Sequence, residues 1–290
     1  MFEKKKFLII GPPGVGKSTI KKVYFEMVNP FNMISTSMAP TRGIDSKIFI
    51  LYNYELGVFD LAGQENNTWF TDEREVFLNS DLIICVFDCN MYIKEIKDFF
   101  YKLIELYEDI KLKKCSIVVF FHKVDLIEKI LLHHKINAFK EFTKTQSLVK
   151  QEIPIYPTSI ATDYFLNTFD YIAKILGKLI SIRILGKDGV DISDLRKDLE
   201  ILISYDISKF YHFETLFFDY NLQHKDALIH LDRLEKLGLV NILIDKNQFF
   251  LTEKAKYFKS SIDTSIKNQN QSKINRILDA MYLFSNLREK

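Results

Sequence analysis

A glycine-rich stretch, "GPPGVGKST", runs from Gly11 to Thr19, between the apolar run "FLII" and a helix-like segment. Its spacing, G-x-x-x-x-G-K-[ST], suits a loop that leaves a strand, wraps its backbone N–H groups around a phosphate and then starts a helix. The lysine reaches the outer phosphates, and the hydroxyl after it is placed to bind Mg2+. Pro12 and Pro13 have no N–H, so the amides that face the phosphate must come from Gly14 onward. The residues expected to bind a nucleoside triphosphate here are Gly11, Gly14, Val15, Gly16, Lys17, Ser18 and Thr19.

A carboxylate, a glycine and a glutamine stand close together in "FDLAGQE". We expect Asp60 to hold the magnesium through water, the Gly63 amide to meet the terminal phosphate and Gln64 to orient an attacking water. Thr41, in "MAPTRGID", offers a hydroxyl to complete the magnesium shell and an amide that senses the third phosphate. The expected metal ligands are therefore Ser18, Thr41 and Asp60, and the expected catalytic residues are Lys17, Thr41 and Gln64.

The stretch "FFHKVDL" ends another strand and contains Lys123 and Asp125. A carboxylate accepts two hydrogen bonds, and guanine presents two adjacent donors, N1–H and the N2 amine, whereas adenine has an acceptor at N1. The presence of Asp125 therefore predicts that the site binds guanine in preference to adenine. In "YPTSI" the backbone of Ser159 and Ile160 is expected to contact the guanine O6.

Three side chains near these motifs have two interpretations each. Arg42 follows Thr41 and is either an arginine finger supplied by the chain itself or a solvated charge, and we favour the solvated charge. Trp69 and Phe70 either anchor a helix to the sheet or form a patch for a partner protein.

Apolar strand-like runs alternate with amphipathic stretches from Lys6 to about Arg183. This alternation predicts an α/β fold with a mainly parallel, six-stranded sheet and helices on both faces. "SKIFILYNYELGVFD" has no room for a helix, so its two strands are expected to form an antiparallel hairpin. All the motifs then fall at the carboxyl ends of strands, where open α/β sheets bind ligands.

This ordered set of motifs resembles the Ras-like small GTPases over about residues 1–180, and within them the Rag branch. The base motif begins with His122, as "HKVD", the last motif is "TSI", and "REVFLNSDLIICVFDC" resembles the Rag segment after switch II. The resemblance implies a GTP/GDP switch with Thr41 in switch I and Gln64 in switch II. It also implies that His122 braces the phosphate loop and contacts the base, and that protein effectors and regulators bind the switch loops.

The pattern changes near Gly186 to Gly189, where we place a domain boundary. The expected domains are 1–183 for the GTPase, 184–192 for a linker, 193–262 for a winged-helix-like domain, and 263–290 for a polar linker with a last amphipathic helix from Lys273 to Leu287. Helices are expected over 193–205, 208–220 and 224–238, followed by one hairpin around "DKNQ". This tail does not resemble the roadblock domain through which Rag proteins pair, so a homodimer or a heterodimer with another GTPase stays open.

The helix before the hairpin carries Lys225, Arg233 and Lys236 against Asp226, Asp232 and Glu235. Because a surface that faces DNA phosphates is normally basic, we expect a protein partner and not DNA. A nucleotide-responsive DNA-binding regulator and a GTP-binding scaffold with negligible hydrolysis are the two alternatives.

Composition sets further limits. The chain has 290 residues and a net charge of +2, which argues neither for nor against nucleic acid. Cys85, Cys89 and Cys115 fit no zinc pattern, so buried reduced thiols and a cytoplasmic location are expected. No apolar run is long enough to span a bilayer, and neither Phe2 nor the final "NLREK" fits a lipidation motif, so no direct membrane anchor is expected.

Overall fold

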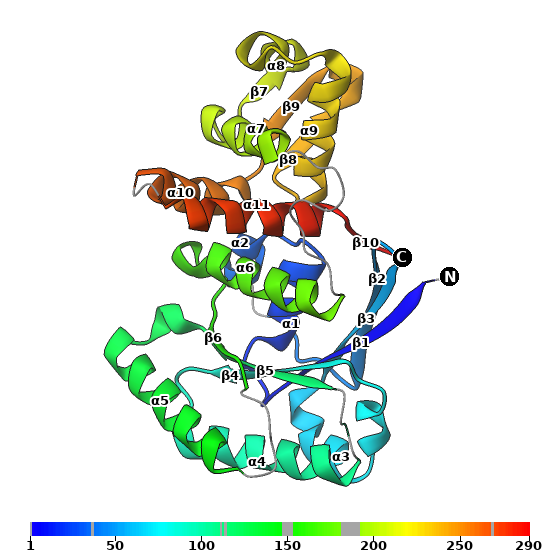
Figure 1. The fold of residues 1–290 in the computed structure, drawn as a ribbon, viewed down its shortest axis with the longest axis vertical. Coiled ribbons are helices and arrows are strands. Elements are labelled where there is room, and N and C mark those ends of the chain that lie inside the picture. Colours follow the sequence, from blue (N-terminus) through cyan, green and yellow to red (C-terminus); the bar gives the residue numbers. More distant parts are fainter. Residues whose placement is uncertain are drawn as a thin grey trace. The chain divides into compact units, whose positions relative to one another are not determined.

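The computed structural model describes residues 2–35, 38–110, 112, 115–146, 153–180, 192–267 and 270–290 (Figure 1). The chain forms two compact units. The first unit is Met1–Lys22, Met38–Ala161 and Glu289–Lys290, and the second unit is Val23–Ser37 and Thr162–Arg288. The boundary expected near Gly186 and most of the expected linker at 184–192 lie outside the described residues.

The first unit is built on a seven-stranded sheet in the order β10-β2-β3-β1-β4-β5-β6. Its strands are β1 (Glu3–Ile10), β2 (Ile44–Leu51), β3 (Tyr54–Leu61), β4 (Leu82–Asp88), β5 (Ser116–His122), β6 (Ile155–Pro157) and β10 (Leu287–Glu289). Strands β3, β1, β4, β5 and β6 are parallel neighbours, and β2 pairs with β3 in antiparallel register. The expected parallel α/β architecture and the expected hairpin are confirmed.

The seventh strand corrects the expectation of six. The last helix was expected to continue to Leu287, but it ends at Ser285 and β10 follows. In the first unit, the Lys290 backbone N–H donates to Ile48 O at 3.0 Å, and the Lys47 ammonium lies 3.0 Å from Glu289. The edge strand β2 has backbone N–H and C=O groups that need hydrogen-bond partners, and the extended segment β10 supplies them. Helical periodicity in the sequence does not reveal this tertiary pairing.

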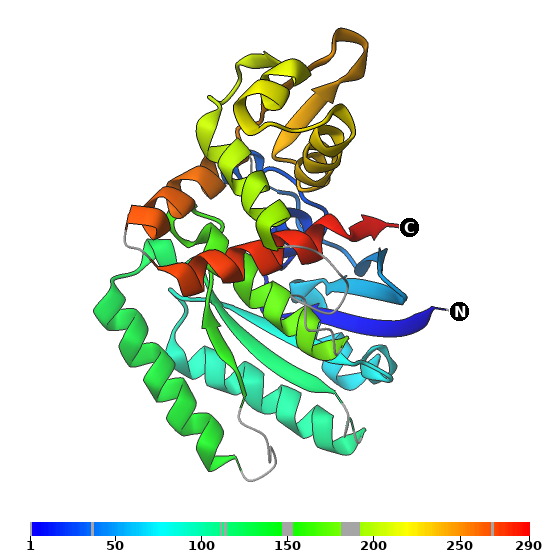
Figure 2. The same cartoon turned by 45° about the horizontal axis from the view of Figure 1, so that its top comes forward.

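Three helices cover one face of this sheet: α3 (Asn66–Thr71), α4 (Ile93–Asp109) and α5 (Lys129–Thr145). Figures 1 and 2 show α4 and α5 side by side on that face. Helix α4 buries Ile96, Phe100, Leu103 and Ile104, the spacing of one helical face. The one fully buried residue of α5 is Phe139, whose ring centroid lies 5.1 Å from that of Phe100. Phe139 therefore anchors α5 to the core.

The second unit contains α2 (Pro30–Ser35), α6 (Thr162–Leu179), α7 (Ile192–Ser204), β7 (Phe210–His212), α8 (Phe213–Tyr220), α9 (His224–Lys236), β8 (Val240–Leu243), β9 (Gln248–Leu251), α10 (Ala255–Lys267) and α11 (Gln271–Ser285). Its three-stranded sheet has the order β7-β9-β8. The helix expected over 208–220 begins only at Phe213, because Phe210–His212 pair with β9, so the expected single hairpin is a three-stranded sheet.

Helix α6 is part of the core of the second unit. Phe169 on α6 stacks on Phe284 of α11 with ring centroids 4.3 Å apart, and it meets Phe258 of α10 edge-to-face. Phe165, one turn earlier, also contacts Phe258. Within the described residues, no helix combines the length and the apolar character that crossing a membrane requires.

Replacing Phe139 by Ala should lower the free energy of unfolding by about 3–5 kcal/mol, because it leaves a cavity where the ring contacts Phe100 and Phe121. Urea titration followed by circular dichroism measures the change. Ile130, on the same helix and 73% exposed, provides the control, and Ile130→Ala should change stability by less than about 0.5 kcal/mol. Equal losses for the two variants would show that Phe139 does not anchor the helix.

Candidate nucleotide-binding site

The phosphate loop connects β1 to a short helix, α1 (Lys17–Ile20), which continues as a π-helical turn, Lys21–Phe25. Gly16, at the end of the loop, has a φ of +99°, a conformation that side chains disfavour. A Cβ atom on Gly16 would lie 2.6 Å from Cδ2 of His122. Only glycine therefore fits between the loop and the imidazole ring, and the two motifs are in direct contact.

Lys17 places a buried positive charge in the loop. Its side chain is 5% exposed, and its ammonium donates to Gly11 O and Pro12 O, both at 2.9 Å. Burial lowers the pKa of this ammonium, and the nearby carboxylate of Asp60 opposes that shift. A buried cation with backbone acceptors on one side is suited to an anionic ligand on the other.

The three expected metal ligands come together. The Ser18 hydroxyl lies 2.8 Å from the Thr41 hydroxyl and donates to Asp60 Oδ2, and Thr41 donates to the same oxygen at 3.4 Å. The other carboxylate oxygen, Oδ1 of Asp60, is buried and has no hydrogen-bond partner among the described residues. Two hydroxyls and one carboxylate, whose second oxygen is buried and unsatisfied, form a hard oxygen donor set that fits Mg2+. Burial raises the pKa of Asp60, and a bound cation would favour its charged form.

Gly63 and Gln64 form the start of a 3-10 turn, Gly63–Glu65, directly after β3. A Cβ atom on Gly63 would lie 2.6 Å from the Lys17 ammonium, so this glycine lies against the phosphate loop. The Gln64 side chain is exposed beside it. Glu65, which we did not predict, accepts a hydrogen bond at 3.0 Å from the backbone N–H of Gly43 and so ties this turn to the segment that carries Thr41.

The neighbouring aromatic residues are structural. Trp69 and Phe70 are buried at 3% and 7% exposure, and the Trp69 indole N–H donates to Ala62 O at 3.0 Å. These contacts agree with the interpretation that they anchor a helix. Arg42 is exposed, as expected of a solvated charge.

The base motif is held from two sides. The Lys123 ammonium donates to Gly14 O at 2.7 Å and lies 2.8 Å from the Asp88 carboxylate, which links the motif to the phosphate loop and to β4. Asp125 is exposed in the 3-10 turn Val124–Leu126 and accepts a hydrogen bond from the Ser159 hydroxyl. The structure therefore brings Lys123, Asp125 and Ser159 to one place, and Ile160 follows as a half-buried neighbour. Asp88 was not predicted, although its position as the last residue of a strand is the same signal that identified Asp60.

The imidazole of His122 is 2% exposed and lies 3.0 Å from the Thr158 hydroxyl, a second partner that the sequence did not reveal. Burial lowers its pKa to about 4, with the Lys123 charge as a second cause. His122 is therefore neutral at physiological pH and offers one donor and one acceptor.

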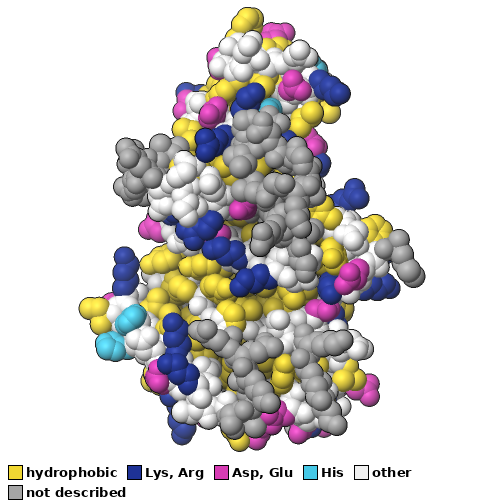
Figure 3. Space-filling model, in the orientation of Figure 1, with side chains coloured by type: hydrophobic (Ala, Val, Ile, Leu, Met, Phe, Trp, Pro, Cys, Tyr) yellow, Lys and Arg dark blue, Asp and Glu magenta, His cyan; other side chains and the backbone are white. Residues whose placement is uncertain are grey.

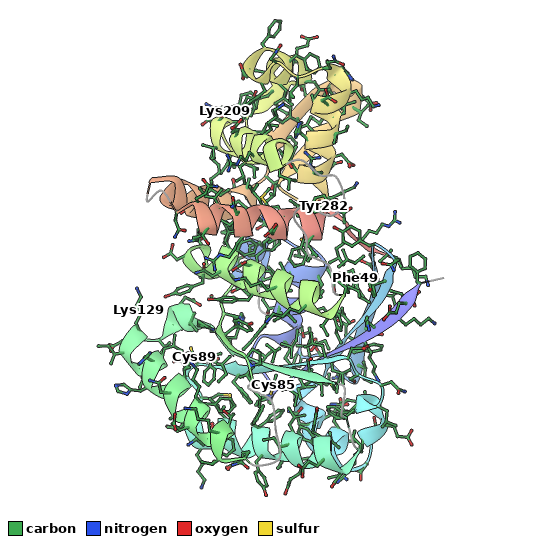
Figure 4. All side chains as sticks on the ribbon, in the orientation of Figure 1. Phe49, Cys85, Cys89, Lys129, Lys209 and Tyr282 are labelled. Atoms are coloured by element: carbon green, nitrogen blue, oxygen red, sulfur yellow. The ribbon has the colours of Figure 1, made fainter. Side chains whose placement is uncertain are left out.

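Two buried thiols lie beside these motifs, and Figure 4 labels both Cys85 and Cys89. The Cys89 thiol donates to Lys123 O at 2.9 Å, and its backbone N–H donates to His122 O at 2.9 Å. Burial raises the pKa of Cys89 to about 11 and that of Cys85 well above its ordinary value. Both thiols are thus protonated, and Cys89 supports the base motif. Within the described ranges, no group of three or more His, Cys, Asp or Glu side chains is placed to hold a metal.

A mainly parallel α/β sheet with a glycine-rich phosphate loop after its first strand defines a P-loop GTPase fold. Residues 6–187 match the family described as "Gtr1/RagA G protein conserved region". This match spans more than half of the chain, and the chain belongs to the Gtr1/RagA family of GTP-binding proteins.

No curated protein matches the chain. Among solved structures, the chain is similar to translation elongation factor SelB from Methanococcus maripaludis, in complex with the GTP analogue GppNHp. The two are 18% identical with a TM-score of 0.46, and the match covers 62% of this chain and 34% of that chain.

Replacing His122 by Asn should flatten the acid limb of the stability profile. The folded pKa of about 4 lies below the ordinary value of 6.5, so between these values the unfolded chain binds more protons and stability falls as the pH falls. The His122 contribution to this loss is on the order of 3 kcal/mol from pH 6.5 to pH 4. Urea midpoints at pH 7, 6, 5 and 4 measure it. Parallel profiles for the two proteins would contradict the assignment of His122 as a buried neutral imidazole.

Proposed function

We propose that the chain is a guanine-nucleotide switch that binds GTP and GDP with Mg2+ and hydrolyses GTP slowly by itself. The observation that carries this proposal is the convergence of Ser18, Thr41 and Asp60 next to the buried ammonium of Lys17. These residues come from three separate segments, and their oxygens are of the kind that hold Mg2+ between phosphates. An isolated glycine-rich turn would not require such an arrangement.

The chain's own residues divide the chemistry among them. Backbone amides from Gly14 to Thr19 surround the phosphates, and Lys17 neutralises charge on the outer two. Ser18, Thr41 and Asp60 would hold the metal, which would neutralise charge on the phosphate oxygens. Gln64, exposed after Gly63, orients the water that attacks the terminal phosphorus, and GDP leaves.

The switch property is supported by the link between the two loops. Glu65 holds the Gly43 amide, and the Ala62 amide donates to Gly43 O at 2.9 Å. Thr41 stands two residues before Gly43, so a terminal phosphate that draws in Thr41 also acts on the turn that carries Gln64. We expect protein effectors and regulators in the cytoplasm to bind these loops, and pairing with a second GTPase chain is open.

For the second unit we propose a winged-helix module that binds protein. The order α7-β7-α8-α9-β8-β9, with a hairpin after the third helix, supports this topology. On α9, Arg233 makes two hydrogen bonds to Asp198 of α7, at 2.8 and 3.1 Å, and Lys236 pairs with Asp232 at 2.6 Å. These two cations are thus already compensated by carboxylates, which favours a protein partner over DNA. On the face shown in Figure 3, both basic and acidic side chains lie on the surface of this module.

Replacing Asp125 by Asn should weaken GTP binding by about 100-fold or more and improve binding of xanthosine triphosphate, because xanthine presents an oxygen at position 2 that the new amide donor matches. Equilibrium titration with fluorescent analogues of both nucleotides measures the two affinities. Asp98→Asn, at an exposed position on α4, is the control that should alter neither. Unchanged GTP affinity in Asp125→Asn would show that this motif does not read the base.

Replacing Gln64 by Leu should leave GTP affinity unchanged and slow hydrolysis about tenfold or more, because it removes the group that positions the water. Single-turnover release of phosphate from bound GTP measures the rate. Equal rates would move the positioning role to another residue, with Arg42 the next candidate. A parent protein that binds GTP but gives no turnover would favour the scaffold alternative.

A further inference from the structure

The segment between the phosphate loop and Thr41 does not stay with the first unit. The chain enters the second unit at Val23 and returns to the first unit at Met38. Val23, Tyr24 and Phe25 are buried at 0%, 0% and 3% exposure. The Tyr24 ring stacks on Phe165 of α6, with centroids 5.3 Å apart. The root of the loop that supplies Thr41 is therefore part of the core of the second unit.

Lys254, which directly precedes α10, makes a polar contact with this segment. Its side chain is buried, with the residue 1% exposed, and its ammonium donates to Met27 O at 3.0 Å. The Met27 sulfur lies 3.6 Å away. The Lys254 ammonium has no carboxylate partner within salt-bridge distance among the residues that the structure describes. Burial lowers its pKa to about 7, because the charged form loses its hydration.

Met27 itself is held in an unfavourable backbone conformation. Its φ is +55°, in the left-handed region that residues with a Cβ atom adopt at a cost. Such a conformation persists where the surroundings fix it, and the surroundings here are Lys254 and the turn after α9. A Cβ atom on Gly238 in that turn would lie 3.4 Å from Met27 O.

Beyond Met27 the described part of the segment buries little side-chain surface. In α2 only Pro30 is buried, whereas Phe31 and Ile34 are 58% and 57% exposed. A helix with so little buried surface has little stability of its own. The contact between Lys254 and Met27 therefore anchors the segment ahead of the loop that carries Thr41.

We propose that Lys254 is a positioning residue for the nucleotide site, which acts by fixing the Met27 backbone and thereby the loop that presents Thr41. This inference rests on the proposed nucleotide switch. It gives the second unit a defined role: a protein that binds the module and moves Lys254 alters nucleotide retention without touching the site. Conversely, a nucleotide that holds Thr41 stabilises the contact between Lys254 and Met27, because coupling between two sites is reciprocal.

Lys259, on α10, provides a matched control. Its ammonium also donates to backbone carbonyls, Ile203 O at 2.9 Å and Tyr205 O at 2.6 Å, but these belong to the end of α7 and the turn after it. Lys254→Met and Lys259→Met thus remove equivalent donors of equal length from one module. Only the first severs a contact with the segment that leads to Thr41.

The first measurement is hydrogen exchange of the full-length proteins without added nucleotide. Lys254→Met should accelerate exchange of the amides at 23–35 and 38–43, whereas Lys259→Met should not. Thermal melting verifies that both variants are folded. If Lys254→Met does not fold, Lys254→Gln takes its place, because its shorter amide does not reach the Met27 carbonyl. Unchanged exchange in these segments for a folded variant would overturn the proposal.

The second measurement is release of a fluorescent GTP analogue in the presence of Mg2+. Lys254→Met should release it roughly two- to tenfold faster, and Lys259→Met at the parent rate. Faster exchange with unchanged nucleotide release would disprove the link to the site. A parent protein that binds no guanine nucleotide would refute the proposed function instead, and the exchange experiment would still decide whether Lys254 fixes the segment.

Discussion

Two buried charged residues, one at the start of α1 and one near the end of β3, impose the constraint on which the rest of the site depends. Lys17 is 5% exposed and Asp60 is 0% exposed, and neither charge can leave water without compensation. The Lys17 ammonium donates hydrogen bonds to two backbone carbonyls. One carboxylate oxygen of Asp60 accepts from two hydroxyls, and the other has no hydrogen-bond partner among the described residues. The glycines, the short helix and the hydroxyls of Ser18 and Thr41 are all arranged around these two groups. A site built in this way suits an anion beside Lys17 and a cation beside Asp60.

Much of this arrangement could be read from the sequence because its signals are local. The phosphate loop, the β2–β3 hairpin and the strand-end positions of Asp60 and Asp125 each depend on a few consecutive residues. The supporting contacts could not be read in this way. The pairs Asp88 with Lys123 and Thr158 with His122 join residues that are 35 and 36 positions apart, and neither partner has a distinctive neighbourhood.

The errors in the fold have the same origin. Phe210–His212 and Leu287–Glu289 are too short to show a strand period, and each becomes a strand only because a neighbouring strand leaves backbone groups to be paired. Likewise, the apolar face of α6 is evident in the sequence, but the sequence does not reveal that Phe165 and Phe169 pack against α10 and α11. Hydrophobic periodicity identifies the helix face that must be buried, but it does not identify the elements that pack against that face.

The position of α6 has a consequence for how such a chain can change in descent. The family region ends at residue 187, yet α6 lies inside it and supplies core aromatic residues to the unit beyond. If the C-terminal helices were exchanged at the end of the family region, the new helices would have to pack against the apolar face of α6, which fits α10 and α11. Tyr24 stacks on the same helix, so the segment after the phosphate loop is under the same packing constraint. Replacement of the tail would require coordinated substitutions in α6 and around Tyr24.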